Sequence, residues 1–91
     1  MIFVTVGTQK QQFTRLFKEI ENSKLLENEE ITAQVGHTKF ESNKMKIFQF
    51  ISFEEMKKYM EEAEFVITHG GVGSIIDALN LNKKVLAVPI S

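Results

Sequence analysis

Short apolar runs alternate with longer amphipathic segments along this chain. Residues 2–6 are almost continuously β-branched or aromatic, which is typical of a strand covered on both faces in a parallel sheet. In residues 11–21 the apolar side chains recur at i, i+3, i+4 and i+7, so we expect an amphipathic helix with one buried stripe. That stripe consists of Phe13, Leu16, Phe17 and Ile20. The chain therefore opens with a strand, a tight loop and a helix.

The same alternation continues through the middle of the chain. Residues 31–36 and 46–50 predict a second and a third strand, and the polar segment between them predicts an irregular connection. Ser52 and Glu55 then fit the capping box S-x-x-E, in which the serine begins a helix and the glutamate reaches back to it. We expect this helix to run to about Ala63.

The C-terminal third predicts a further strand, loop, helix and strand. Residues 65–68 form the fourth predicted strand, residues 74–81 the helix, and residues 83–89 the fifth strand. Apolar strands that alternate with helices predict an α/β fold: a Rossmann-like, mainly parallel sheet of about five strands with flanking helices. We expect residues 1–91 to belong to one domain. No helix follows the last predicted strand, so either the sequence is part of a longer protein, which we favour, or another chain covers that face of the sheet.

Composition narrows the classes of function. There is no cysteine, which removes disulfides, thiolate metal sites and thiol nucleophiles, and the formal net charge of -1 without a basic tract disfavours nucleic acid as a partner. The N-terminus matches a first strand better than a signal peptide, and no apolar run approaches the roughly 20 residues that span a bilayer. We therefore expect a cytoplasmic domain without a membrane span of its own.

The segment that follows the fourth predicted strand is the strongest indication of a binding site. It reads His-Gly-Gly-Val-Gly-Ser from His69 to Ser74, and its glycines are Gly70, Gly71 and Gly73. Three glycines within four residues allow a ligand to approach the backbone, and the helix that begins near Ser74 offers unpaired N–H groups to an anion. The alternative is that this segment is only a tight turn between a strand and a helix and binds no ligand.

Two further features fit a nucleoside diphosphate. Asp77 lies about one helical turn beyond the glycines, where its carboxylate could hold a ribose, or could serve only as a charge at the helix start. Phe50 and Ile51 at the end of the third strand are candidates for contacts with the base. His69 is either an acid, base or phosphate donor or an ordinary loop histidine, and the solvated alternative is preferred for His37.

Several other site types are not matched by the sequence. The third glycine of G-x-G-x-x-G is absent and the glycines follow the fourth strand rather than the first, which disfavours a nicotinamide cofactor. Neither a P-loop, H-E-x-x-H nor G-x-S-x-G occurs, and two separated histidines do not make a zinc site. We expect no metal and no cofactor.

Three stretches together resemble a known family. "IFVTVGTQ", "FISFEEM" and "AEFVITHGGVGSIIDAL" are similar to the C-terminal donor-binding domain of glycosyltransferase family 28 over essentially the whole chain. They are most similar to its short, single-domain subunits, which include the eukaryotic donor-binding subunit of the dolichol-linked N-acetylglucosamine transferase. Bacterial exopolysaccharide and capsule glycosyltransferase subunits are similar too. The resemblance implies the C-terminal half of a GT-B fold.

The resemblance also implies which residues bind the donor, a UDP-sugar that is a substrate. The glycines of the loop and Ser74 would line the diphosphate and the sugar, and Asp77 would stand where the family has a ribose-binding glutamate. Gly7, Thr8 and Gln9 would border the cleft that faces a partner. The relatives continue past the equivalent of Pro89 into a His-Gln pair that helps hold the donor sugar.

The implied reaction is metal-independent and inverting. An acceptor hydroxyl would displace UDP at the anomeric carbon with help from a general base, which is His69 or a group of the partner. A membrane-associated subunit would supply the lipid-linked acceptor, which places the chain peripherally at the inner face of the membrane. Two rival interpretations remain: a non-catalytic module that activates a separate transferase, and an unrelated nucleotide-binding enzyme.

Overall fold

The apolar runs of the chain pair with one another as parallel strands. The structure is a computed structural model, and it describes residues 1–8, 10–69 and 84–88. Its strands are β1 (Ile2–Thr5), β2 (Ile31–Gln34), β3 (Met45–Phe48), β4 (Phe65–His69) and β5 (Lys84–Val88). They form one sheet in the order β3-β2-β1-β4-β5, and every neighbouring pair is parallel. The predicted α/β sheet is confirmed.

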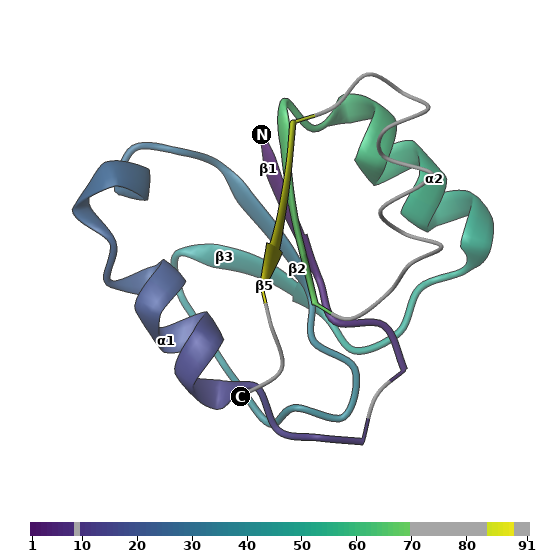
Figure 1. Cartoon of the computed structure of the whole chain (residues 1–91), viewed down its shortest axis with the longest axis horizontal. Helices are drawn as coiled ribbons and strands as arrows, with labels where there is room; N and C mark the ends of the chain where they lie inside the picture. The colour runs from purple at the N-terminus through teal and green to yellow at the C-terminus, as the bar shows by residue number, and fades with distance from the viewer. Residues whose placement is uncertain (9, 70–83, 89–91) are drawn as a thin grey trace.

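Two α-helices cover opposite faces of this sheet, as Figure 1 shows. Helix α1 (Thr14–Glu21) connects β1 to β2 and is followed by a 3-10 turn, η1 (Lys24–Leu26), which the sequence pattern did not indicate. Helix α2 (Phe53–Glu62) connects β3 to β4. The predicted helix over residues 74–81 lies outside the described residues.

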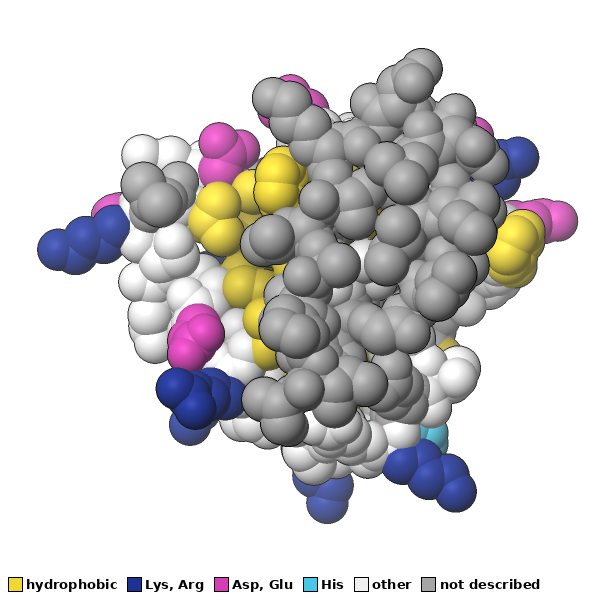
Figure 2. Space-filling view, viewed as in Figure 1, with side chains coloured by type: hydrophobic (Ala, Val, Ile, Leu, Met, Phe, Trp, Pro, Cys, Tyr) yellow, Lys and Arg dark blue, Asp and Glu magenta, His cyan; other side chains and the backbone are white. Residues whose placement is uncertain are grey.

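The alternation of side chains along each strand divides the core into two layers. On the α1 side, Val4 and Ile67 of the sheet pack with Phe17 and Ile20 of the helix. On the α2 side, Phe3 and Val66 pack with Met60 and Ala63. Figure 2 shows a group of hydrophobic side chains left of the centre of one face and charged side chains mostly around its rim.

Helix α1 begins three residues later than its apolar spacing predicts. Its N-cap is Phe13, whose N–H donates to the hydroxyl of Thr38 (3.0 Å). The preceding Gln12 uses its side chain to bond the His37 carbonyl (2.7 Å) and the Lys39 N–H (2.9 Å). Gln12 and Phe13 are therefore held by the segment after β2, and the helix begins after them.

Helix α2 begins where the capping box places it. The Ser52 hydroxyl accepts from the Glu55 N–H (3.1 Å) and lies 3.2 Å from Oε1 of the same residue. This pair satisfies a backbone donor that the first turn of a helix leaves without an intrahelical partner. The prediction for the start of this helix is confirmed.

Candidate functional site

The strand order reverses at the centre of the sheet, between β1 and β4. From β1 the chain builds outward through β2 to β3, and it then returns to the other side of β1 and continues from β4 to β5. Thr5 at the end of β1 stands opposite Gln34 on one side and Thr68 on the other. In open parallel sheets ligands bind outside the carboxyl ends of the strands at such a reversal. The crevice above β1 and β4 is therefore the candidate site.

Gly7 forms the bend that follows β1 at this edge. Its φ of 66° lies in the left-handed region, which glycine adopts without a steric penalty. Among the described residues, no heavy atom lies within 4 Å of the position that a Cβ would occupy there, leaving the chain neighbours aside. The next residue, Thr8, is exposed. The described part of the chain thus leaves space beside the Gly7 backbone, as a close-approaching ligand requires.

The amide of Gly7 is already engaged by the protein. It donates to Oε1 of Gln34 (2.9 Å), and the Gly7 carbonyl accepts from Nε2 of the same side chain (2.9 Å). The Gly7 N–H is therefore not available to a ligand, and Gly7 contributes to the site through its backbone conformation. Thr8 is the described residue of this bend with an exposed side chain.

Gln34 is the principal residue of this edge that the sequence analysis did not identify. It is 1% exposed, although it carries an amide in the middle of the sheet. The available signal was an amide side chain within the predicted strand "ITAQV", because a buried amide needs partners for its hydrogen-bonding groups.

The end of β3 supplies an exposed aromatic side chain near the same edge. Phe50 is 51% exposed, and its ring meets His37 edge-on with ring centroids 5.2 Å apart and an interplanar angle of 72°. Ile51 is half-buried and packs against the core on the α2 side. Of the two predicted base contacts, Phe50 is the one with a large accessible surface.

The remaining predicted site residues follow β4. His69 is the last residue of β4 and is paired with Val88 of β5, so the segment after it leaves the carboxyl edge beside the Gly7 bend. The side chain of His69 lies outside the described part of the structure. So do Gln9, Gly70, Gly71, Gly73, Ser74 and Asp77, whose assignments stay predictions.

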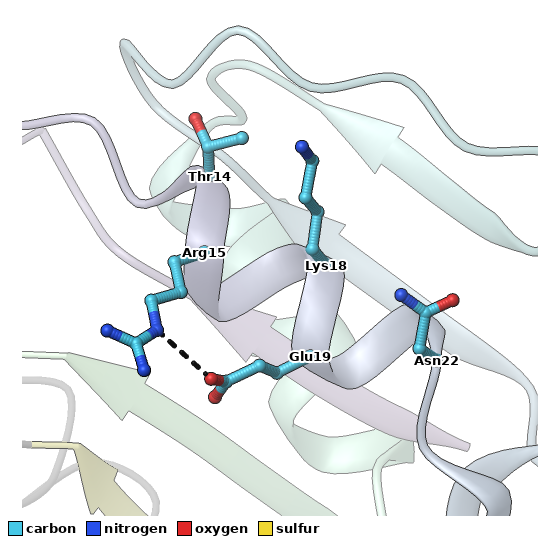
Figure 3. A pocket seen from close by; sticks show the side chains of 5 residues that line it. All are labelled: Thr14, Arg15, Lys18, Glu19 and Asn22. Carbon is cyan, nitrogen blue, oxygen red and sulfur yellow. Dashed lines mark hydrogen bonds and ion pairs between the residues drawn. The ribbon is translucent and has the colours of Figure 1, made fainter.

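A surface pocket lies elsewhere, on the outer side of α1. It is lined by the five side chains in Figure 3: Thr14, Arg15, Lys18, Glu19 and Asn22. The first four lie on α1 and Asn22 is its C-cap, and Arg15 is paired with Glu19 at 3.2 Å. The pocket collects no residues from the carboxyl ends of the strands and is not the candidate site.

Two classes of feature are absent from the described part of the chain. Within residues 1–8, 10–69 and 84–88, no three His, Asp or Glu side chains cluster closely enough to hold a metal ion. In the same residues, no helix has the length and apolar character that crossing a bilayer demands.

Comparison with protein families identifies the domain. The model of the glycosyltransferase family 28 C-terminal domain matches residues 1–91. The chain belongs to this family. Solved structures share the fold: the glycosyltransferase SnogD from Streptomyces nogalater has a TM-score of 0.74 and 18% identity over 99% of this chain and 25% of its own. The glycotransferase of kitacinnamycin gives a TM-score of 0.71 at 14% identity over 99% of this chain and 24% of its own.

Two curated relatives of the family 28 domain extend this comparison. Zeaxanthin glucosyltransferase from Pseudescherichia vulneris is 34% identical over 99% of this chain, which spans 23% of that protein. The UDP-N-acetylglucosamine transferase subunit ALG13 from Debaryomyces hansenii is 27% identical over 93% of this chain, which spans 45% of that protein. The chain thus covers under half the length of either relative and has the fold of a GT-B glycosyltransferase half.

Proposed function

We propose that this domain binds the UDP-sugar donor of an inverting, metal-independent hexosyltransferase that acts on a lipid-linked acceptor. One observation carries the proposal: β1 and β4 are parallel neighbours at the point where the strand order reverses. The Gly7 bend and the glycine-rich segment after His69 therefore start from adjacent strand ends. Such a crevice is the usual nucleotide position in sheets of this order.

Each part of the donor has a proposed contact. The diphosphate and sugar lie against Gly70, Gly71, Gly73 and Ser74, with the Gly7–Thr8 bend and Gln9 on the other side. Asp77 accepts hydrogen bonds from the ribose hydroxyls. The exposed ring of Phe50, with Ile51 beneath it, meets the uracil.

The relatives support this choice of donor and of assembly. ALG13 is named as a subunit of a UDP-N-acetylglucosamine transferase, and the zeaxanthin enzyme transfers glucose. We accordingly propose a UDP-hexose or UDP-N-acetylhexosamine donor and a membrane-associated partner subunit that binds the acceptor. That partner holds the domain at the cytoplasmic face of the membrane, in exopolysaccharide, capsule or glycolipid synthesis.

The proposed reaction balances without a metal. The acceptor oxygen forms a bond to the anomeric carbon on the face opposite UDP, the bond to the UDP oxygen breaks, and the acceptor proton passes to a general base. Backbone N–H groups of the glycine-rich segment and the N-terminus of the helix predicted after it would stabilise the charge on departing UDP. The base is His69 or a side chain of the partner.

The proposal is tested by ligand titration. UDP, UDP-GlcNAc, UDP-galactose and NAD are added separately to the protein while backbone amide shifts are followed by NMR. We expect shifts at residues 7–9, 50 and 69–77 with the uridine nucleotides and none with NAD. Equal shifts with NAD indicate a different nucleotide enzyme, and no shifts with any ligand indicate a non-catalytic module; either result contradicts the proposal.

The ribose contact has its own test. Replacement of Asp77 by Ala removes a charge-assisted hydrogen bond worth about 1.5–3 kcal/mol, so we expect UDP affinity to fall at least tenfold. With 2′-deoxy-UDP the same substitution has a smaller effect, because one hydroxyl partner is already gone. An equal loss for both ligands argues against the assignment.

A further inference from the structure

The side-chain amide of Gln34 uses all of its hydrogen-bonding capacity at the carboxyl edge of the sheet. Its Oε1 accepts from the Thr5 hydroxyl (2.6 Å) and from the Gly7 N–H (2.9 Å). Its Nε2 donates to the carbonyls of Gly7 (2.9 Å) and Gln49 (2.7 Å). An amide oxygen has two acceptor sites and an amide nitrogen has two donors, so no group is left over.

These contacts join the ends of three strands to one side chain. Gln34 ends β2, Thr5 ends β1 with Gly7 just after it, and Gln49 follows β3. Gln34 and Gln49 lie on the β2 and β3 side of the Gly7 bend, whereas β4 and the candidate crevice lie on its other side. The bend is therefore held by hydrogen bonds on its β2 side, and none of these bonds lies on the side that faces the crevice.

Both polar groups of Gly7 are fixed by this arrangement. Because its N–H and its carbonyl bond to the same amide, its two flanking peptide planes can rotate only if two partly buried hydrogen bonds are broken. The Gln34 amide, in a residue that is 1% exposed, would then be left without these partners. The position of Thr8, next along the chain, follows from that of Gly7.

We propose that Gln34 is a positioning residue of the donor site: it presets the Gly7–Thr8 bend against the donor diphosphate without touching the donor itself. This inference rests on the proposed function. A bend that already has its bound conformation loses little conformational freedom when a ligand binds, and the ligand therefore binds more tightly. The distinguishing consequence is that loss of the amide weakens donor binding in protein that remains folded.

The test uses Gln34→Met, which keeps the length of the side chain and removes its four hydrogen bonds. The matched control is Thr32→Val, at a buried polar residue of the same strand (3% exposed) whose side chain is outside this network. The Kd for UDP is measured by calorimetry, at a temperature where circular dichroism shows each variant folded. We expect Gln34→Met to weaken UDP binding about tenfold and Thr32→Val to leave it within about twofold.

A second measurement follows the bend directly. Hydrogen exchange of the Gly7 and Thr8 amides should accelerate in Gln34→Met at least about tenfold more than exchange of the Val4 amide in the strand. If Gln34→Met does not fold, Thr5→Val replaces it; this variant removes one of the four bonds, and we expect about threefold weaker UDP binding.

The outcomes separate the two proposals. A wild-type protein that does not bind UDP contradicts the proposed function and this inference with it. A wild-type protein that binds UDP, together with unchanged Kd in the Gln34→Met or Thr5→Val variant, contradicts the inference alone and leaves Gln34 a structural residue.

Discussion

A Cβ atom added to Gly36 would lie 2.6 Å from the carbonyl oxygen of Gly7. The two glycines follow neighbouring strands, and both have left-handed backbones, with φ of 59° at Gly36 and 66° at Gly7. Their surroundings differ, because the corresponding position at Gly7 meets no atom of the described residues within 4 Å. Gly36 is thus required for close packing of two bends, whereas Gly7 is required for its backbone conformation and the space beside it.

This difference predicts unequal costs for the same substitution. Gly7→Ala carries only the left-handed backbone penalty, about 1–2 kcal/mol. Gly36→Ala adds a clash with a backbone atom that Gln34 holds in place, so we expect a loss of about 2–4 kcal/mol. Urea denaturation of both variants measures the two free energies of unfolding. Equal losses of unfolding free energy in the two variants would contradict this prediction, because they would show that the Gly7 and Gly36 bends can move apart and relieve the clash.

The Ser52 cap should contribute measurably to stability. Ser52→Ala removes the acceptor for the Glu55 N–H and should lower the free energy of unfolding by about 0.5–2 kcal/mol. Ser52→Asn keeps an acceptor at the cap and should recover most of the loss. Thermal melts of the three proteins check this, and a melt of Ser52→Ala that coincides with wild type would contradict it.

The hydroxyl of Thr38 should matter more than its methyl group. Thr38 is 1% exposed and accepts from the Phe13 N–H at the start of α1. Thr38→Val removes this acceptor from a buried position, with an expected cost of about 1–3 kcal/mol. Thr38→Ser retains the hydroxyl and serves as the control. Denaturant midpoints of the pair give the comparison; a larger loss in the serine variant would assign the effect to packing.

Phe50 and Phe53 are both exposed, so the same substitution at each of them tests the proposed contact with the base. Phe50→Ala should weaken UDP binding by about 1–3 kcal/mol, the usual range for an aromatic platform under a base. Phe53 is 75% exposed at the start of α2 and has no role in the proposed donor site, so Phe53→Ala should leave the Kd unchanged. Calorimetric titration of both variants with UDP distinguishes them. Similar Kd values in both would remove Phe50 from the site.

Local patterns were sufficient for the elements of the fold. The parallel strands, the α1 stripe of Phe17 and Ile20 and the Ser52 cap depend on residues close together in the sequence. The late start of α1 could not be predicted from such local patterns. It depends on Gln12 and Thr38, which lie 26 positions apart in the sequence. The 2.6 Å between the Gly7 carbonyl oxygen and a Cβ added to Gly36 likewise depends on residues far apart in the sequence.

The sequence by itself determined the fold class, the family and the glycine-rich segment after β4, because periodicity, capping and a motif are properties of neighbouring residues. Only the tertiary structure decided that the Gln34 amide hydrogen-bonds to the Gly7 bend and that the rings of Phe50 and His37 are in contact at the surface. Those relationships arise when parallel pairing brings distant strand ends to one edge. A buried amide must then find its partners across strands, and no pattern along a single strand specifies which ones they are.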